Sequence, residues 1–298
     1  MKRVLFLVPG KTDLAKQKAD VFAKKIQQKT NKNIQIESAA IKELFFEISS
    51  EKVAIYHPEK KFDLRDFDLV IIRHISGMAN EAHAIAQYCE NFNIKYTDEY
   101  LNRLLPDNKM SSEFLLWFNG IKNIPHTFYG NLNEMKRRFA EFGERAILKD
   151  NEGAKGRLNF LVRSVDEIQE IHDANPEVNF VLQEFIPNNG DLRILILGGD
   201  PALVIERRSN QGSHLNNTSQ GGSSKLLDIE EVEPEILVAS RKAAEVSKLQ
   251  VAGVDIVIDS QNDKFYILEV NNAPQVSSGS FKEEKAIQYA KMVERINE

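Results

Sequence analysis

The stretch YILEVNNAP, residues 266–274, changes from apolar to polar in the middle of an apparent strand. Three large apolar side chains lead directly into Glu269 and then Asn271. Just upstream, VAGVDIVID at residues 251–259 places Asp255 within an equally apolar run. A carboxylate within an apolar strand is costly to bury unless it has a partner. The two strands therefore form either a surface hairpin or the floor of a site.

Pairing of the two strands would bring their carboxylates together. If the turn is centred near Asn262, antiparallel pairing places Asp255 opposite Glu269, with Cβ atoms about 5 Å apart. Because side chains alternate along a strand, Glu269 and Asn271 should share a face with Ile267.

Two carboxylates at this separation repel each other. A hard cation bound by carboxylate and amide oxygens removes the conflict, and Mg²⁺ keeps its remaining positions for water and phosphate. Asp255, Glu269 and Asn271 therefore predict a site for Mg²⁺ or Mn²⁺ that is bound together with a nucleotide. The alternative is that Asp255 faces water and Glu269 pairs with an arginine.

Composition narrows the function classes. The chain has 298 residues, which predicts two or three structural units. Its formal net charge is −5 and its basic residues are dispersed, so no global field favours nucleic acid or an anionic membrane. Cys89 is the one cysteine, which excludes an internal disulfide and a thiolate zinc site. Because no apolar stretch approaches ~20 residues, we expect a cytosolic protein with no membrane span. The oligomeric state stays open, a homo-oligomer included.

The first hundred residues alternate strand and helix, which predicts a small α/β unit with a mostly parallel sheet. We expect strands at residues 3–8, 34–38, 67–77 and 94–99, and helices at 13–29 and 80–92. No G-x-G-x-x-G follows the first strand, so a dinucleotide-binding domain is not indicated. Arg73 and His74, at the end of a strand, either contact a ligand or form a solvated strand end.

The remainder predicts a mixture of helices and mainly antiparallel strands. Asp107 or Asn108 can cap a helix that runs to Trp117, and Ser164 can cap another. We expect strands at residues 145–150, 159–164, 180–186, 191–199 and 201–209, a polar loop at 210–224, a helix at 234–248, the hairpin and a final helix.

Lysines and glycines supply candidate phosphate contacts. Lys149 ends an apolar strand, where a charged side chain needs a reason, and the loop from Glu152 to Gly156 follows. Gly153 and Gly156 allow the backbone to approach an anion closely, with Lys155 between them. The spacing does not match a Walker A loop, and a plain flexible hairpin is the alternative.

A candidate adenine site lies in FVLQEFIP, residues 180–187. A strand that leaves the core at Gln183, Glu184, Phe185 and Ile186 offers backbone edges to a planar base. Asp191 could then accept hydrogen bonds from ribose hydroxyls. The alternative is an ordinary strand followed by a turn.

The order of these motifs resembles the ATP-grasp ligases. Lys149, the glycine loop, QEFI…DLR, ERR, NN…GG, VAGVD and LEVN follow one another as in the branch containing the ribosomal-protein glutamate ligase and the amino-group-carrier ligase of lysine biosynthesis. The resemblance covers roughly residues 106–278. It implies an α/β and α+β protein, in which the ATP-grasp fold follows an N-terminal Rossmann-like pre-ATP-grasp domain. The implied division is 1–104 for that domain, 105–180 for the lid subdomain and 181–298 for the subdomain with the metal site.

The resemblance also implies a role for each matching position. Lys109 and Lys149 would contact the ATP phosphates, Glu152–Gly156 would form the lid over them, Glu184 and Ile186 would form the adenine hinge, Asp191 would bind ribose, Asp255, Glu269 and Asn271 would bind magnesium, and Arg208 and Asn217 would lie near the reacting phosphate. One departure stands out, because the branch usually carries arginines where this chain has Leu215 and Gln220. We therefore expect an amine partner less acidic than glutamate.

The implied activity is ligation of a carboxylate to an amine. ATP would phosphorylate the carboxylate of a small molecule or peptide, and an amine donor would attack the resulting acyl phosphate. The alternatives are a ligase that modifies a peptide, one that joins free amino acids, and a nucleotide-binding regulator that has lost catalysis.

Overall fold

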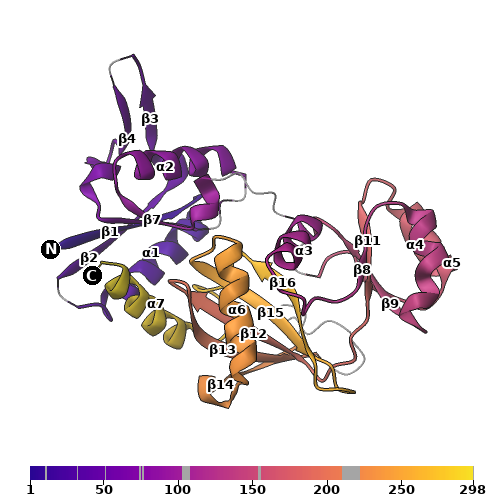
Figure 1. The fold of residues 1–298 in the computed structure, drawn as a ribbon. Helices are drawn as coiled ribbons and strands as arrows, with labels where there is room; N and C mark the ends of the chain where they lie inside the picture. The colour runs from indigo at the N-terminus through magenta and orange to yellow at the C-terminus, as the bar shows by residue number, and fades with distance from the viewer. Residues whose placement is uncertain are drawn as a thin grey trace.

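The computed structural model describes the chain except residues 11, 32, 51, 74, 76, 103–107, 154–155, 210–221 and 298. Figure 1 shows an N-terminal lobe, a central lobe with one large sheet, and a smaller lobe on the far side of it. Short 3₁₀ helices span Ile41–Glu43, Leu64–Asp66, Glu99–Asn102, Phe139–Phe142 and Ile229–Glu231. No helix among the described residues is both long enough and apolar enough to cross a membrane.

The N-terminal lobe contains the predicted parallel sheet, with strand order β2-β1-β6-β7. Its strands are β1 (Lys2–Val8), β2 (Ile34–Ala40), β6 (Leu69–Ile72) and β7 (Lys95–Thr97), and its helices are α1 (Asp13–Gln27) and α2 (Ala79–Asn91). Alternate β1 residues enter two separate apolar clusters, Phe6 with α1 and Leu5 with α2. Both faces of the sheet are therefore covered, which explains the continuous apolar run of β1.

A three-stranded antiparallel sheet projects from this lobe and was not predicted (Figure 1). It contains β3 (Phe45–Ile48), β4 (Val53–His57) and β5 (Phe62–Asp63). Phe45 and Ile48 are exposed, so this hairpin lacks the buried alternation by which a half-buried strand is found in a sequence.

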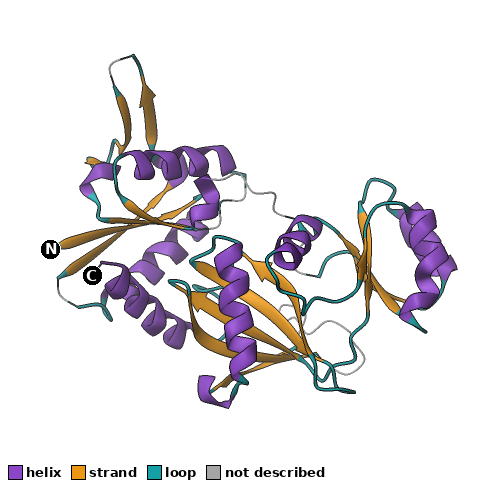
Figure 2. Cartoon of the chain, viewed as in Figure 1, coloured by secondary structure: helices purple, strands orange, loops and turns teal. Residues whose placement is uncertain are grey.

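The smaller lobe, here called the lid lobe, is built on an antiparallel sheet with strand order β10-β9-β11-β8. Its strands are β8 (Thr127–Phe128), β9 (Ala146–Asp150), β10 (Asn159–Val162) and β11 (Phe180–Glu184). Helices α4 (Leu132–Arg138) and α5 (Val165–Ala174) cover its outer face (Figure 2). Because β11 pairs with β9 and β8, this sheet extends past residue 180, where the sequence-based division ends the lid subdomain.

The central sheet is antiparallel, with strand order β14-β13-β12-β15-β16. Its strands are β12 (Asp191–Leu197), β13 (Asp200–Arg208), β14 (Ser223–Leu227), β15 (Val251–Ile258) and β16 (Phe265–Asn271), and α6 (Pro234–Val246) packs on one face. Helix α3 (Lys109–Phe118) lies between this sheet and the lid lobe, and the Asn108 side chain caps it by accepting from the Ser111 amide (Figure 1). Strand β14 was missed, because its sequence reads as the end of a polar loop.

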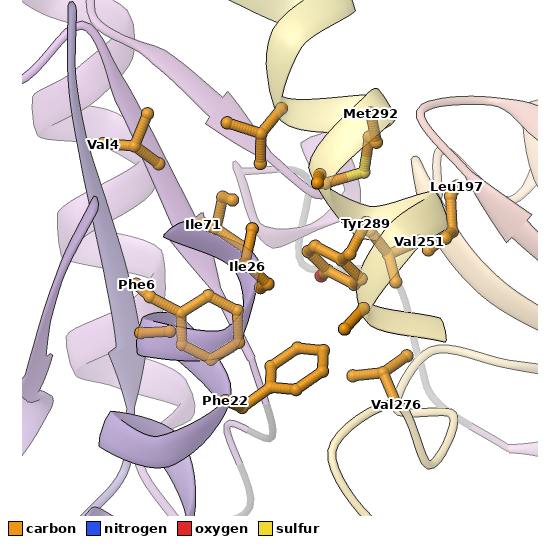
Figure 3. Packing of buried hydrophobic residues seen from close by; sticks show 14 of the residues in the cluster. Val4, Phe6, Phe22, Ile26, Ile71, Leu197, Val251, Val276, Tyr289 and Met292 are labelled. Carbon is orange, nitrogen blue, oxygen red and sulfur yellow. The ribbon is translucent and has the colours of Figure 1, made fainter. Parts of the chain in front are cut away.

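Helix α7 (Lys282–Asn297) joins the central sheet to the N-terminal lobe. Figure 3 shows Tyr289 of α7 beside Phe6 and Phe22, with Leu197 and Val251 of the central sheet on its other side. The three aromatic rings pack edge to face. A single apolar cluster therefore fixes the N-terminal lobe against the central sheet.

Arg73 strengthens the same junction. Only 1% of its surface is exposed, and its guanidinium donates to the carbonyls of Val251 and Asn272 and pairs with Asp98 at 3.3 Å. The expectation of a ligand contact or a solvated strand end was therefore wrong for Arg73, because the strand end is buried between lobes. His74 lies outside the described residues.

Candidate active site

A cleft lies between the lid lobe and the central sheet, with about 960 Å³ free of atoms and partly open to solvent. We call it the central cleft. Among the residues singled out from the sequence, it is lined by Lys109, Lys149, Gly153, Gly156, Gln183, Glu184, Phe185, Ile186, Asp191, Asp255 and Glu269. Glu152, Arg208 and Asn271 are not among its lining residues, and Lys155, Leu215, Asn217 and Gln220 lie outside the described part of the chain.

The floor of the central cleft is the hairpin of β15 and β16. Asp255 pairs with Glu269, as predicted. The register shifts beside this pair, so that Leu268 is the extra residue of a bulge. Ile267 consequently points to the opposite face and joins the core under α6. The prediction that Glu269 and Asn271 share a face with Ile267 is therefore wrong, since it assumed unbroken alternation.

The two carboxylates have different surroundings. Burial and the charge of Asp255 raise the pKa of Glu269, with Lys109 and Lys149 acting in the opposite direction. In the described chain no cationic group lies within ion-pair distance of Glu269. Asn271 contacts the other member of the pair, because its Nδ2 donates to Asp255 Oδ2 at 3.3 Å.

Two arginines neutralise Asp255. Arg193, its direct neighbour on β12, donates through Nε and Nη2 at 2.7 and 2.6 Å, and Arg207 Nη2 lies 3.2 Å away. Burial alone would raise the pKa of Asp255, but the two guanidinium groups lower it overall. Arg207 also binds Asp191 through two contacts of 2.6 and 2.7 Å. The predicted ribose ligand and the predicted metal ligand thus share one arginine.

Of the two arginines in ERR, it is Arg207 that reaches this cluster. Arg208 lies at the end of β13, is exposed, and pairs with Glu206 at 2.9 Å. Residues 206 and 208 share a face of the strand with Val204, which packs in the core under α6. Arg208 therefore occupies the face of β13 away from Arg207.

A series of buried side-chain hydrogen bonds positions Lys149 in the lid-lobe wall of the central cleft. Lys149 Nζ donates to Gln183 Oε1 at 2.9 Å, and Gln183 Nε2 donates to Glu113 Oε1 and Thr127 Oγ1. Burial lowers the pKa of Lys149, partly offset by the charge of Glu113. The side chain of Gln183 therefore orients a cation, which is a different task from presenting backbone to a base.

Lys109 joins α3 to the loop after β9. Its Nζ donates to the Gly153 carbonyl at 2.6 Å, and its amide donates to the Asn151 carbonyl. Gly153 has no room for a side chain, because a Cβ there would lie 2.8 Å from the Asp150 Cβ. Glu152 is exposed, and its amide donates to Asp150 Oδ1. The first part of the predicted lid loop is therefore tied to the base of α3.

The predicted adenine hinge leaves the lid sheet where β11 ends. Glu184 still donates its amide to the His126 carbonyl. Within the described chain, the amides of Phe185 and Ile186 have no backbone acceptor, while the Ile186 carbonyl accepts from Asn188 Nδ2. This stretch therefore offers backbone polar groups to the central cleft.

The donor set at the floor fits a magnesium ion. No cluster of three or more His, Cys, Asp or Glu side chains able to hold a metal occurs among the described residues. Asp255, Glu269 and the amide oxygen of Asn271 are the protein groups that would hold the ion, and phosphate and water would complete its shell. The uncompensated carboxylate of Glu269 is the observation that favours a cation here.

Three residues of this site were not selected from the sequence: Glu113, Arg193 and Arg207. Arg193 follows Asp191 at a spacing of two on a strand, which places both on one face. That spacing was the available signal. Glu113 carried none, because a glutamate on a helix is ordinarily solvated.

Comparison with known proteins identifies the family. A family model for the RimK-like ATP-grasp domain matches residues 106–296. The chain belongs to the RimK-like ATP-grasp family. The predicted resemblance, the ATP-grasp fold and the assignment to the ATP-grasp ligases are thereby confirmed.

Relatives and solved structures agree with this membership. A probable alpha-L-glutamate ligase of Shewanella halifaxensis is 27% identical over 242 residues, which is 78% of this chain and 51% of that protein. One of Cellvibrio japonicus is 25% identical over 250 residues, 82% and 81% of the two chains. The chain thus spans about half the length of the first relative and most of the second.

Two solved structures share the fold. A RiPP-associated ATP-grasp ligase of Chryseobacterium gregarium, in complex with ADP and a leader and core peptide, has a TM-score of 0.70 and 17% identity, with 99% of this chain and 97% of that chain covered. The ATP-grasp ligase PsnB, with a precursor variant, Mg and ADP, has a TM-score of 0.71 and 12% identity, with 100% and 99% covered.

Proposed function

We propose that the protein is an ATP-dependent carboxylate–amine ligase that acts through an acyl phosphate and releases ADP and phosphate. The observation that carries this proposal is the opposed pair Asp255 and Glu269 on the floor of a cleft that is also lined by Lys109 of α3 and Lys149 of the lid lobe. Carboxylates can bind the metal ion, and lysines can neutralise the phosphates. Paired carboxylates that face lysines therefore suit a polyphosphate bound together with a metal ion.

In this proposal the adenine lies against Phe185 and Ile186, whose amides lack backbone acceptors in the described chain. Asp191 would accept from ribose hydroxyls, because a carboxylate bound by one arginine keeps further lone pairs. Lys149, oriented by Gln183, and Lys109 donate to the phosphates. Gly153 and Gly156 would let the loop approach the phosphates closely.

Magnesium, when bound, would neutralise phosphate charge between Asp255, Glu269 and Asn271. The residues of this chain have two further tasks. Arg193 and Arg207 are placed beside the carboxylates, where they can stabilise negative charge that develops during transfer of the phosphoryl group. The remaining contribution is to hold the reactants in line, which is the main work of phosphoryl transfer.

The bonds made and broken follow from this arrangement. A substrate carboxylate oxygen attacks the terminal phosphorus of ATP, and the bond to the bridging oxygen of ADP breaks. The amine nitrogen then attacks the acyl carbon, phosphate leaves, and the nitrogen loses a proton. The products are an amide, ADP and phosphate.

The direct test is a screen for phosphate release with ATP, Mg²⁺ and pooled amino acids and peptides, followed by mass spectrometry. The expected product has the mass of the carboxylate plus the amine minus water. Nucleotide binding without phosphate release from any pool would instead favour a regulator that has lost catalysis.

A further inference from the structure

A second cavity is lined by Arg193 and Arg207, the two arginines that bind carboxylates of the central cleft. It has about 430 Å³ free of atoms and is partly open to solvent, and its apolar lining is Leu195, Ile205 and Pro274. Its polar lining comes from Arg193, Arg207, Lys285, Ser224, Gln275 and Ser280. Three of these side chains are cationic, and no carboxylate is among its lining residues.

Lys285 occupies a position that disfavours its charge. The residue is 4% exposed and lies in the first turn of α7, where the helix dipole opposes a cation. Burial and the nearby Arg193 lower its pKa to about 8. Its one hydrogen bond in the described chain is a long one, 3.4 Å from Nζ to the Ser278 carbonyl. No carboxylate of the described chain forms an ion pair with it.

The two arginines connect this cavity to the central cleft. Arg193 and Arg207 use Nε and Nη2 to bind Asp255 and Asp191, which line the central cleft. The Nη1 groups have no acceptor within the described chain. Among the described residues, each guanidinium therefore has one edge engaged by a carboxylate that lines the central cleft and one nitrogen, Nη1, without an acceptor.

We propose that Lys285 is a specificity-determining residue, which together with Arg193 binds a carboxylate of a substrate in this second cavity. In the described chain Lys285 has no carboxylate partner, while Arg193 and Arg207 already bind Asp255 and Asp191. An anion would supply the partner that Lys285 lacks, and the planar guanidinium of Arg193 matches a carboxylate. The apolar lining beside them suits the aliphatic part of an amino acid. The proposal rests on the proposed ligase function and specifies how the amine donor is held, by a carboxylate that does not react.

The test measures binding of free amino acids against their carboxamides. Glycine, alanine and lysine, and the amide of each, are titrated calorimetrically into protein saturated with Mg²⁺ and a non-hydrolysable ATP analogue. At least one free amino acid should bind at least tenfold more tightly than its amide. Lys285→Met should remove this preference, and Lys285→Arg should restore most of it. Lys282→Met, which changes an exposed lysine of the same helical turn, should leave it intact.

Thermal unfolding gives a readout that does not depend on substrate. Because the Lys285 charge is buried without a counterion, Lys285→Met should raise the Tm of the ligand-free protein, whereas a structural lysine would make it fall. A falling Tm, equal binding of acid and amide, or a preference that survives Lys285→Met would overturn the proposal. If the ATP analogue itself fails to bind wild-type protein, the proposed ligase function fails as well, which separates the two.

Discussion

Asp255 and Glu269 are directly opposed on β15 and β16, and only Asp255 is neutralised by neighbouring side chains. Two arginines hold Asp255, while Glu269 has no cation within ion-pair distance in the described chain. The pair therefore carries an electrostatic strain that a divalent cation would relieve. Because of this asymmetry, replacing Glu269 should lower activity without lowering stability.

Replacing Glu269 by glutamine should reduce turnover strongly while the protein stays folded. We expect a loss of about 10²–10³-fold in kcat/KM, the range for a group that stabilises transition-state charge. ATP binding by this variant, measured by titration calorimetry, should also depend less on Mg²⁺. Full turnover by Glu269→Gln would remove the residue from the site.

The same variant should also change how stability depends on pH. The pKa of Glu269 is raised in the folded protein, so stability falls as the pH rises from the unfolded pKa to the folded value, and the full cost remains above it. Glu269→Gln should therefore raise the Tm of the ligand-free protein at pH 7.5, by about 2 °C. The difference should vanish below the unfolded pKa of about 4.3, where both side chains are neutral. A lower Tm at pH 7.5 would mean that Glu269 has a stabilising partner.

Arg207 and Arg208 provide a matched comparison. Arg207→Gln leaves the buried carboxylates of Asp191 and Asp255 short of a partner, which should cost about 3–5 kcal/mol of unfolding free energy. Arg208→Gln removes an exposed pair with Glu206 and should leave stability unchanged. Urea denaturation at neutral pH measures both. Equal losses in the two variants would contradict the placement of Arg207.

Gln183 should act through Lys149. Gln183→Leu removes the acceptor of the buried Lys149 Nζ, which should lower the free energy of unfolding by about 1–3 kcal/mol. The free energy of ATP binding should become weaker by a similar amount. Gln261→Leu, at an exposed turn position, serves as the control. If ATP affinity is unchanged in Gln183→Leu, this side chain does not position the lysine that contacts phosphate.

The loop after β9 should close over nucleotide. Lys109 Nζ donates to the Gly153 carbonyl, and exposed Arg157 follows in the same loop. Binding of Mg·ATP should order this segment, so tryptic cleavage after Arg157 should slow at least severalfold. Unchanged cleavage, in protein shown independently to bind ATP, would argue against a closing lid.

The sequence predicted most of the fold, because its signals were local. The parallel N-terminal sheet, the cap at Asn108 and the opposition of Asp255 and Glu269 each followed from periodicity or turn position. The projecting β3–β4 hairpin did not, since Phe45, Phe46, Ile48 and Val53 are apolar residues that face solvent. The bulge at Leu268 was also missed, because nothing in an apolar strand marks the residue that will be left unpaired.

The candidate site was predictable where its residues interrupt an apolar run, as Lys149 and Asp255 do. It was not predictable where a residue contributes through distant partners. Arg207 and Arg208 are adjacent in the sequence, and only the strand pairing decides which one meets Asp191. Lys285 reads as one more lysine of a charged helix, and its burial depends on packing of α7 against the central sheet.

The most direct test of the central claim is isotope transfer from the substrate carboxylate. Amino acids and peptides labelled with ¹⁸O in their carboxyl groups are incubated with the protein, ATP, Mg²⁺ and amines, and the released phosphate is analysed by mass spectrometry. Activation through an acyl phosphate predicts one ¹⁸O atom in each phosphate that accompanies amide formation. Amide formation with unlabelled phosphate, or with the label in AMP, would contradict it.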